Sequence, residues 1–168
     1  VIGYVGALIT SRLDLPLLEM IATQRPDWTL VLVGPEDDAF LASALHQCRN
    51  VHFTGNRPAE ELPAWISSFD VCINPQVLNG MTIGNYPRKI DEYLALGKPV
   101  VATDTVAMRM FAPYVYLCGG PITLRRSIPR CRKETTATCR KQGKPLHCHI
   151  PGNSVYSYWG YIWNKFKT

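Results

Sequence analysis

The sequence predicts an α/β fold: a doubly wound, Rossmann-like parallel sheet with helices on both faces. Three observations lead to this expectation. Short aliphatic runs recur along the first 118 residues, and amphipathic stretches separate them. The aliphatic runs are continuous rather than alternating, which is typical of strands buried on both faces. Regular alternation of strand and helix with short connections favours parallel strands joined by right-handed crossovers.

Six segments are predicted as strands, because each is a short aliphatic or β-branched run bounded by turn residues. They are Val1–Gly6, Trp28–Gly34, Val51–Phe53, Phe69–Asn74, Pro99–Ala102 and Tyr114–Leu117. Ligands of such sheets bind outside the carboxyl ends of the strands. The loops of interest are therefore Gly6–Arg12, Gly34–Asp37, Gly55–Arg57, Pro75–Tyr86 and Thr103–Thr105.

Four segments between the strands are predicted as helices. The first begins after Asp14, which is suited to be its N-cap, and ends before Pro26. The other three are Asp38–Cys48, Pro58–Ser68 and Tyr86–Leu96, and Gly97 is predicted as the left-handed C-cap of the last. The aromatic residues Trp28, Trp65 and Tyr93 are interpreted as packing residues.

Length and composition place the chain among single-domain proteins. Its 168 residues suit one domain, and no apolar run approaches the roughly 18 residues of a membrane span. The chain opens on Val1 without a signal peptide or an initiator Met, so we expect a fragment of a longer, cytoplasmic protein. The six cysteines include no pair at the short spacing of a zinc knuckle, and no metal site is predicted.

Charge is divided unevenly between two parts of the chain. Residues 1–118 carry 8 Lys or Arg against 12 Asp or Glu, a balance of −4, whereas residues 119–168 carry 10 against 1, a balance of +9. We therefore assign residues 1–118 to the domain and residues 119–168 to a basic tail.

An out-of-frame translation is one hypothesis for the basic tail. Helical and strand patterns stop near Cys118. Back-translation from His149 in a shifted frame permits His-Thr-Trp-Glu, and a stop codon at the Phe166–Lys167 junction. The alternative is a genuine basic tail that binds nucleic acid or an acidic membrane. The tail would pack poorly on the domain if the frame is shifted, and the sequence of the gene decides between the two.

One segment, Asn85–Thr103, is the most informative for function. Lys89 and Glu92 are three residues apart near the start of its helix, which places both side chains on one face. A helix N-terminus at a sheet edge attracts phosphate, and a lysine adds positive charge there. A carboxylate accepts hydrogen bonds from a ribose diol. The pair therefore predicts a nucleotide-diphosphate site, and the alternative is an ordinary surface ion pair.

The same segment resembles the donor-binding segment of GT-B glycosyltransferases, especially the retaining group often called family 4. The matching residues are Glu92, Gly97, Pro99, Val100, Val101 and Ala102. Upstream pieces fit in order, at Val1–Leu8, Trp28–Pro35, Val51–Gly55 and Glu61–Pro75. The resemblance covers about the first 118 residues, as the C-terminal domain of such an enzyme.

One departure from the family pattern concerns how the donor sugar is held. Many members carry a second glutamate eight positions before the first, but this chain has Gly84 there. The sequence is closer to a subgroup with Asn-x-x-Thr upstream, here Asn79 and Thr82. Backbone amides of Gly80–Asn85 are the substitute that we expect. Further donor-binding candidates are Gly6, Arg12, Arg57, Thr82 and Asn85.

The resemblance implies a glycosyltransferase that moves a sugar from a nucleotide-diphosphate donor to a hydroxyl acceptor with retention, without a metal or other cofactor. Polysaccharide biosynthesis is the family's typical context. The fragment is expected to be inactive without its N-terminal acceptor domain, and peripheral membrane association is expected of the parent enzyme. Nucleic acid is not an expected partner of the domain. The alternatives are a nucleotide-sugar epimerase of GT-B fold and a non-catalytic nucleotide-binding domain.

Overall fold

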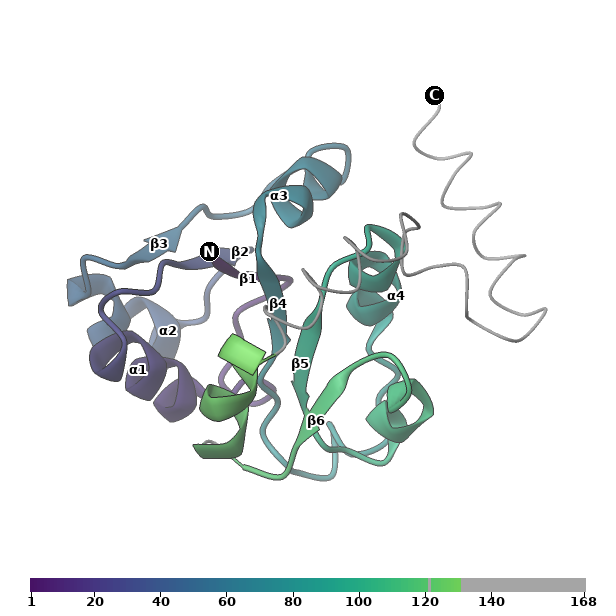
Figure 1. Ribbon diagram of the computed structural model, residues 1–168. Coiled ribbons are helices and arrows are strands. Elements are labelled where there is room, and N and C mark those ends of the chain that lie inside the picture. Colours follow the sequence, from purple (N-terminus) through teal and green to yellow (C-terminus); the bar gives the residue numbers. More distant parts are fainter. Residues whose placement is uncertain (121, 131–168) are drawn as a thin grey trace.

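A six-stranded parallel sheet forms the centre of the molecule in the computed structural model, which describes residues 1–120 and 122–130 (Figure 1). The strand order is β3-β2-β1-β4-β5-β6, and every neighbouring pair is parallel. The strands are β1 (Ile2–Val5), β2 (Leu30–Val33), β3 (Val51–Phe53), β4 (Val71–Asn74), β5 (Val100–Thr103) and β6 (Tyr116–Cys118). The predicted α/β fold class is confirmed.

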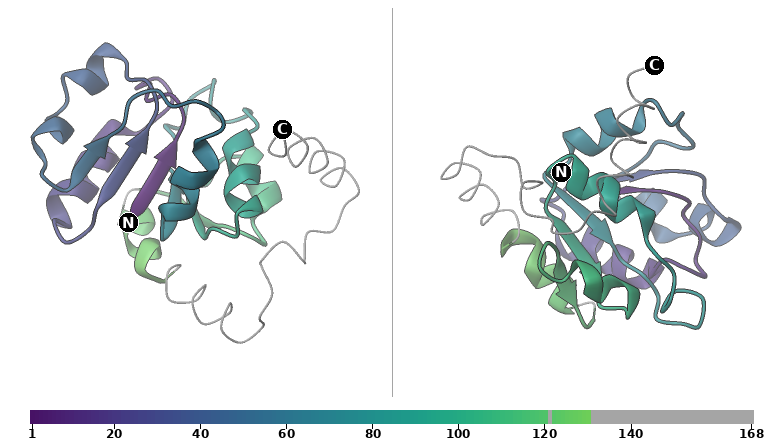
Figure 2. Two further views of the ribbon diagram at one scale, coloured as in Figure 1. Left: turned by 90° about the horizontal axis from the view of Figure 1, so that it is seen from above. Right: turned by 90° about the vertical axis from the view of Figure 1, so that its right-hand side faces the viewer.

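Helices cover both faces of the sheet, so that two core clusters form (Figure 2). One cluster joins the sheet to α1 (Leu15–Gln24), α2 (Asp38–Leu41), the 3-10 helix η1 (Ala44–Gln47) and the helix at 122–130. The other joins the opposite face to α3 (Leu62–Ser68), α4 (Arg88–Ala95) and the 3-10 helix η2 (Ala107–Phe111). Successive strand residues point to opposite faces, which is why the continuous aliphatic runs fill both clusters.

Several predicted limits were wrong. The elements expected from Trp28, Phe69 and Tyr86 each begin two residues later, and three further elements differ as follows. The helix expected over Asp38–Cys48 is broken into α2 and η1, because Ser43 is extended and its hydroxyl donates to the carbonyl of Phe40 at 2.7 Å. The helix expected from Pro58 begins only at Leu62. The last strand begins at Tyr116, since the amides of the two preceding residues both donate to the carbonyl of Phe111.

Capping residues act as predicted at the ends of α1 and α4. The carboxylate of Asp14 accepts a hydrogen bond from the amide of Leu17 at 2.9 Å. Gly97 follows α4 with φ +66°, a conformation that favours glycine.

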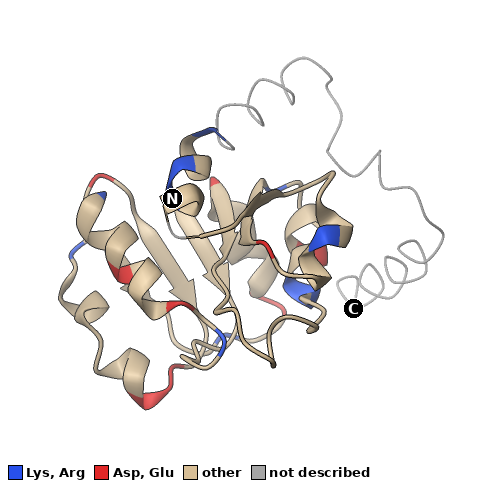
Figure 3. Ribbon diagram, turned by 90° about the horizontal axis from the view of Figure 1, so that it is seen from below, with Lys and Arg blue, Asp and Glu red and all other residues tan. Residues whose placement is uncertain are grey.

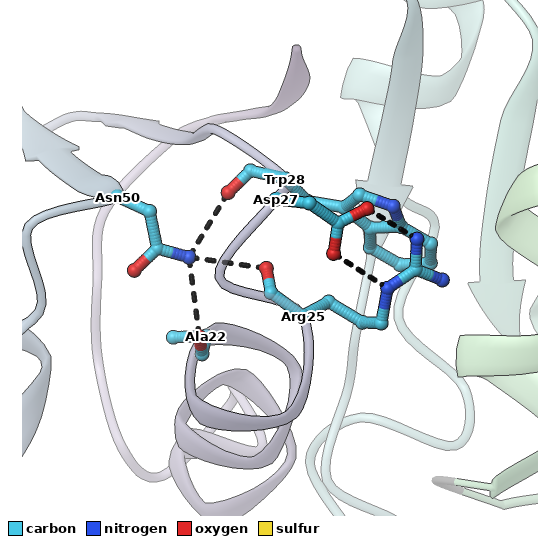
Figure 4. Close-up of polar contacts among 5 residues, drawn as sticks. All are labelled: Ala22, Arg25, Asp27, Trp28 and Asn50. Carbon is cyan, nitrogen blue, oxygen red and sulfur yellow. Dashed lines mark hydrogen bonds and ion pairs between the residues drawn. The ribbon is translucent and has the colours of Figure 1, made fainter.

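A polar cluster at the amino ends of the strands fixes the turn from α1 to β2 (Figure 4). The side-chain amide of Asn50 donates to the carbonyls of Ala22, Arg25 and Trp28 at 3.1, 3.3 and 2.9 Å. Arg25 pairs with Asp27 and lies over the ring of Trp28, 3.9 Å from its centroid. Trp28 also packs against the core, in agreement with its interpretation as a packing residue.

The described chain continues beyond the predicted domain limit at residue 118. Residues 122–130 are helical, and Leu124 and Ile128 are buried in the core cluster that includes α1. The poor packing expected of the tail does not hold for this stretch. Residues 131–168 lie outside the described residues, and the frame hypothesis stays a prediction.

Candidate functional site

The site lies at the topological switch point of the sheet, between β1 and β4. From β1 the chain adds β2 and β3 on one side, and from β4 it adds β5 and β6 on the other. β1 and β2 pair over four residues, but β1 and β4 pair only at Ile2–Val71 and Gly3–Cys72. The two strands therefore part before their carboxyl ends, in the position where open α/β sheets bind ligands.

Tyr93 of α4 closes the gap that opens between β1 and β4. The amide of Gly6 donates to a carbonyl of the β2 strand, so the alternating amide of Val5 faces the β4 side. That amide donates to the Tyr93 hydroxyl at 2.8 Å, and the hydroxyl lies 3.4 Å from the Val5 carbonyl oxygen. Tyr93 is fully buried, and burial raises its pKa well above the usual value. The neutral phenol thus fastens α4 to the end of β1.

Lys89 lies one turn before Tyr93 on α4 and reaches the same end of β1. Its ammonium group contacts the hydroxyl of Tyr4 and lies 4.0 Å from the centroid of the Tyr4 ring. Burial lowers the pKa of Lys89 to about 8; the Glu92 carboxylate opposes this change and the Arg12 guanidinium adds to it. The Lys89 ammonium group therefore lies at the switch point, and the positive charge of Arg12 contributes to lowering its pKa.

Gly6 provides the space that the Lys89 ammonium occupies. Its φ is +137°, and a Cβ added there would lie 2.8 Å from the Nζ of Lys89 and 3.1 Å from the hydroxyl of Tyr4. The residue that follows β2 is even closer, since a Cβ at Gly34 would lie 2.1 Å from the carbonyl oxygen of Gly6. Any side chain at Gly6 would both strain the backbone and displace the lysine.

Glu92 lies on the same helix face as Lys89 but does not neutralise it. Among the described residues, the salt bridges within 4.0 Å do not include a Lys89–Glu92 pair. Glu92 is partly buried, and burial raises the pKa of its carboxyl group while Lys89 counteracts the change. The alternative of a plain surface ion pair therefore does not describe these two residues.

The loop after β4 is built around a turn at Asn79. The side-chain oxygen of Asn79 accepts hydrogen bonds from the amides of Met81 and Thr82 at 2.9 and 3.0 Å. The Thr82 hydroxyl is buried and donates to the Val77 carbonyl. Thr82, predicted as a donor-binding residue, thus shapes the loop from within. Asn85 follows on the same loop and is exposed.

Hydrogen bonds connect this loop to the loop after β1. The side-chain amide of Asn79 donates to the carbonyl of Ser11 at 2.8 Å, and the amide of Val77 donates to the carbonyl of Arg12 at 3.0 Å. The position of Arg12 is thereby coupled to the shape of the loop after β4. Arg57 is not part of this group: it follows β3, and its guanidinium lies 5.5 Å from the centroid of the Trp65 ring on α3.

Sequence reasoning missed the polar roles of two tyrosines at the site. Tyr93 was interpreted as a packing residue only, and Tyr4 was not singled out. Both phenols lie inside otherwise apolar segments, and a buried hydroxyl group needs a hydrogen-bond partner. Tyr4 lies two residues before Gly6, and Tyr93 directly follows Glu92. Their proximity in the sequence to predicted site residues could have indicated a role at the site.

Charges over the described chain are mixed rather than gathered in one region (Figure 3). No described helix is long and apolar enough to cross a membrane. Within the described residues, no group of three or more His, Cys, Asp or Glu side chains is placed to hold a metal ion.

Comparison with known proteins identifies the class and then the family. Residues 1–113 match the model of the family described as Glycosyl transferases group 1. The chain is 36% identical over 121 residues to the "Putative teichuronic acid biosynthesis glycosyltransferase TuaH" of Bacillus subtilis, which covers 69% of this chain. Crystal structures of Anabaena HepE superpose with TM-scores of 0.65, in complex with UDP, and 0.66, in complex with UDP-glucose.

The fold is that of a Rossmann-like domain of GT-B glycosyltransferases. The chain belongs to the group 1 family of glycosyltransferases. The two HepE structures are 18% and 22% identical to it and cover 98% and 82% of its residues, so they establish similarity of fold. The chain spans only 30% of TuaH, and 48% and 40% of the HepE chains.

Proposed function

We propose that this chain is the donor-binding domain of a glycosyltransferase, and that it binds a nucleotide-diphosphate sugar at the β1–β4 switch point. The observation that carries the proposal is the Lys89 ammonium group, which the Tyr4 hydroxyl holds at the Gly6 turn. A buried ammonium whose pKa is lowered by burial and by a neighbouring guanidinium gains stability when an anion binds beside it. The N-terminal end of α4 adds a favourable dipole for a phosphate group.

Glu92 is assigned to the ribose hydroxyls of the donor. It lies one turn along α4 from Lys89, so the spacing suits a diphosphate at one residue and a ribose at the other. Its carboxylate forms no salt bridge with Lys89 in the described part of the chain, so both oxygens can accept hydrogen bonds from a diol. The backbone amides of Gly80–Asn85 are assigned to the sugar ring, and the Asn79 turn orients that loop.

The reaction assigned to the parent protein is transfer of the sugar to a hydroxyl acceptor with retention of configuration and without a bound metal. Support for a nucleotide-sugar donor comes from HepE, whose structures contain UDP and UDP-glucose. Support for polysaccharide assembly comes from TuaH, whose name assigns it to teichuronic acid biosynthesis. Because the chain spans less than half of these relatives, the acceptor groups are assigned to the rest of the parent protein.

Isothermal titration of the 168-residue chain with UDP and UDP-glucose tests the proposal. We expect saturable binding of both, and a loss of about tenfold or more in Lys89→Met, since one charge-assisted contact contributes about 1.5–3 kcal/mol. Arg25→Met is the matched control, because it removes one partly buried cation at the opposite edge of the sheet. Absence of UDP binding by the parent chain, or equal losses in the two variants, would contradict the assignment.

A further inference from the structure

We propose that Tyr4 is a positioning residue for donor binding: its hydroxyl holds the Lys89 ammonium at the Gly6 turn, where the diphosphate binds. This inference rests on the function proposed above and assigns a role to a strand residue that itself lies beneath the site.

Tyr4 is packed in the hydrophobic core, and its hydroxyl is the polar group that the side chain brings there. The residue is 2% exposed, and its ring belongs to the core cluster that includes α1. Its hydroxyl contacts the Lys89 ammonium group and lies 3.4 Å from the carbonyl oxygen of Ala7. The phenol therefore donates toward a carbonyl of the loop after β1 and accepts from the lysine of α4.

A phenol suits this task better than a carboxylate does. Lys89 has a flexible stem and three donors, and without an acceptor inside the crevice its ammonium would turn toward water. Burial raises the pKa of Tyr4 above its ordinary value, so the phenol stays neutral. It orders the ammonium and leaves the positive charge available for an anion. A carboxylate in the same place would neutralise that charge.

Tyr93 fixes the position of Lys89 relative to Tyr4. Its hydroxyl accepts from the Val5 amide at 2.8 Å, and Val5 directly follows Tyr4 in β1. Tyr93 stands one turn after Lys89 in α4, so the helix that carries the lysine is fastened to the strand that carries its acceptor. The two tyrosines together set where the ammonium lies relative to Gly6.

The test is a double-mutant cycle on UDP binding by the full chain, with Tyr4→Phe, Lys89→Met and the double variant. Tyr4→Phe keeps the buried ring and removes only the hydroxyl. We expect Tyr4→Phe to raise the Kd for UDP about tenfold, the range for a hydrogen bond to a charged group. In the Lys89→Met background the same change should have no further effect, because Tyr4 acts through Lys89. Tyr114→Phe, which precedes β6, is the control for loss of a phenol hydroxyl.

Two results overturn the inference while the proposed function stands: equal UDP binding by Tyr4→Phe and parent, or a further loss when Tyr4→Phe is added to Lys89→Met. Absence of UDP binding by the parent instead contradicts the proposed function. If thermal melting shows that Tyr4→Phe does not fold, NMR of the parent decides. A nuclear Overhauser contact between the Lys89 ε-methylene and the Tyr4 ring, kept when UDP binds, supports the inference, and its absence overturns it.

Discussion

Donor affinity should fall as the pH rises through about 8, because the free protein loses the charge of Lys89 there. The pKa of Lys89 is lowered to about 8 by burial, and the groups that face it are Tyr4 on β1, Arg12 on the next loop and Glu92 on its own helix. Carboxyl and guanidinium side chains ordinarily titrate well outside the range from pH 7 to 9. Tyr4 has a raised pKa and stays neutral. Lys89 is therefore the group of this site that changes charge between pH 7 and 9.

The magnitude follows from the protonated fraction of Lys89. With a pKa of about 8, that fraction falls from about ten elevenths at pH 7 to about one eleventh at pH 9. If the diphosphate binds only the ammonium form, the Kd for UDP rises about tenfold, which corresponds to about 1.4 kcal/mol. The terminal phosphate of UDP ionises near pH 6 and so contributes little above pH 7.

The stability of the ligand-free protein should change in the opposite direction. The lowered pKa means that the folded state binds fewer protons than the unfolded chain between about pH 8 and the ordinary lysine value of 10.5. Lys89 therefore makes the free energy of unfolding rise with pH across this window. Below about pH 8 the lysine is charged in both states, and the destabilising effect of burying its charge is fully present. The two opposite slopes distinguish a titrating Lys89 from a general loss of structure at high pH.

Isothermal titration with UDP at pH 7, 8 and 9 is the assay for affinity, and urea denaturation at the same pH values is the assay for stability. Lys89→Met is the control, and its weaker UDP binding should be nearly independent of pH. An unchanged parent Kd between pH 7 and 9 would refute the reasoning. The same pH dependence in parent and Lys89→Met would refute it as well.

Four further outcomes follow from the same contacts. Tyr93→Phe should lower the free energy of unfolding by about 1–3 kcal/mol in urea denaturation, since it leaves a buried strand amide without an acceptor; an unchanged midpoint would contradict this. Gly6→Ala should weaken UDP binding as well as the fold, because its Cβ would meet the Lys89 ammonium, whereas Gly97→Ala, at φ +66° with nothing within 4 Å, should affect the fold alone. Glu92→Ala should weaken UDP binding by about 1–3 kcal/mol, and titration curves that match the parent's would rule out its ribose role. The purified chain should transfer no glucose from UDP-glucose to an added acceptor, and any product detected by mass spectrometry would show that it carries a complete active site.

Local chemistry along the chain was enough to predict the fold class. Continuous aliphatic runs such as Trp28–Gly34 have no polar face to turn toward water, so they predict strands covered on both sides, and β2 is one of them. The ends of the helices could also be predicted from nearby residues, because the Asp14 cap and the Gly97 turn depend on groups a few residues apart. The break between α2 and η1 was missed because the Ser43 hydroxyl bonds to the backbone of the preceding turn, which hydrophobic periodicity does not record.

By itself, the sequence determined the parallel sheet and the helix that carries Lys89 and Glu92, because periodicity, burial and capping are properties of neighbouring residues. Only the tertiary structure decided what these residues contact. Lys89 meets Tyr4, which is 85 positions away, and Tyr93 meets Val5, 88 positions away. Both contacts exist because β1 and β4 separate after two paired residues. The amide of Val5 in β1 then has no partner in β4 and donates to the hydroxyl of Tyr93 in α4. That divergence depends on packing across the whole sheet, which no local pattern contains.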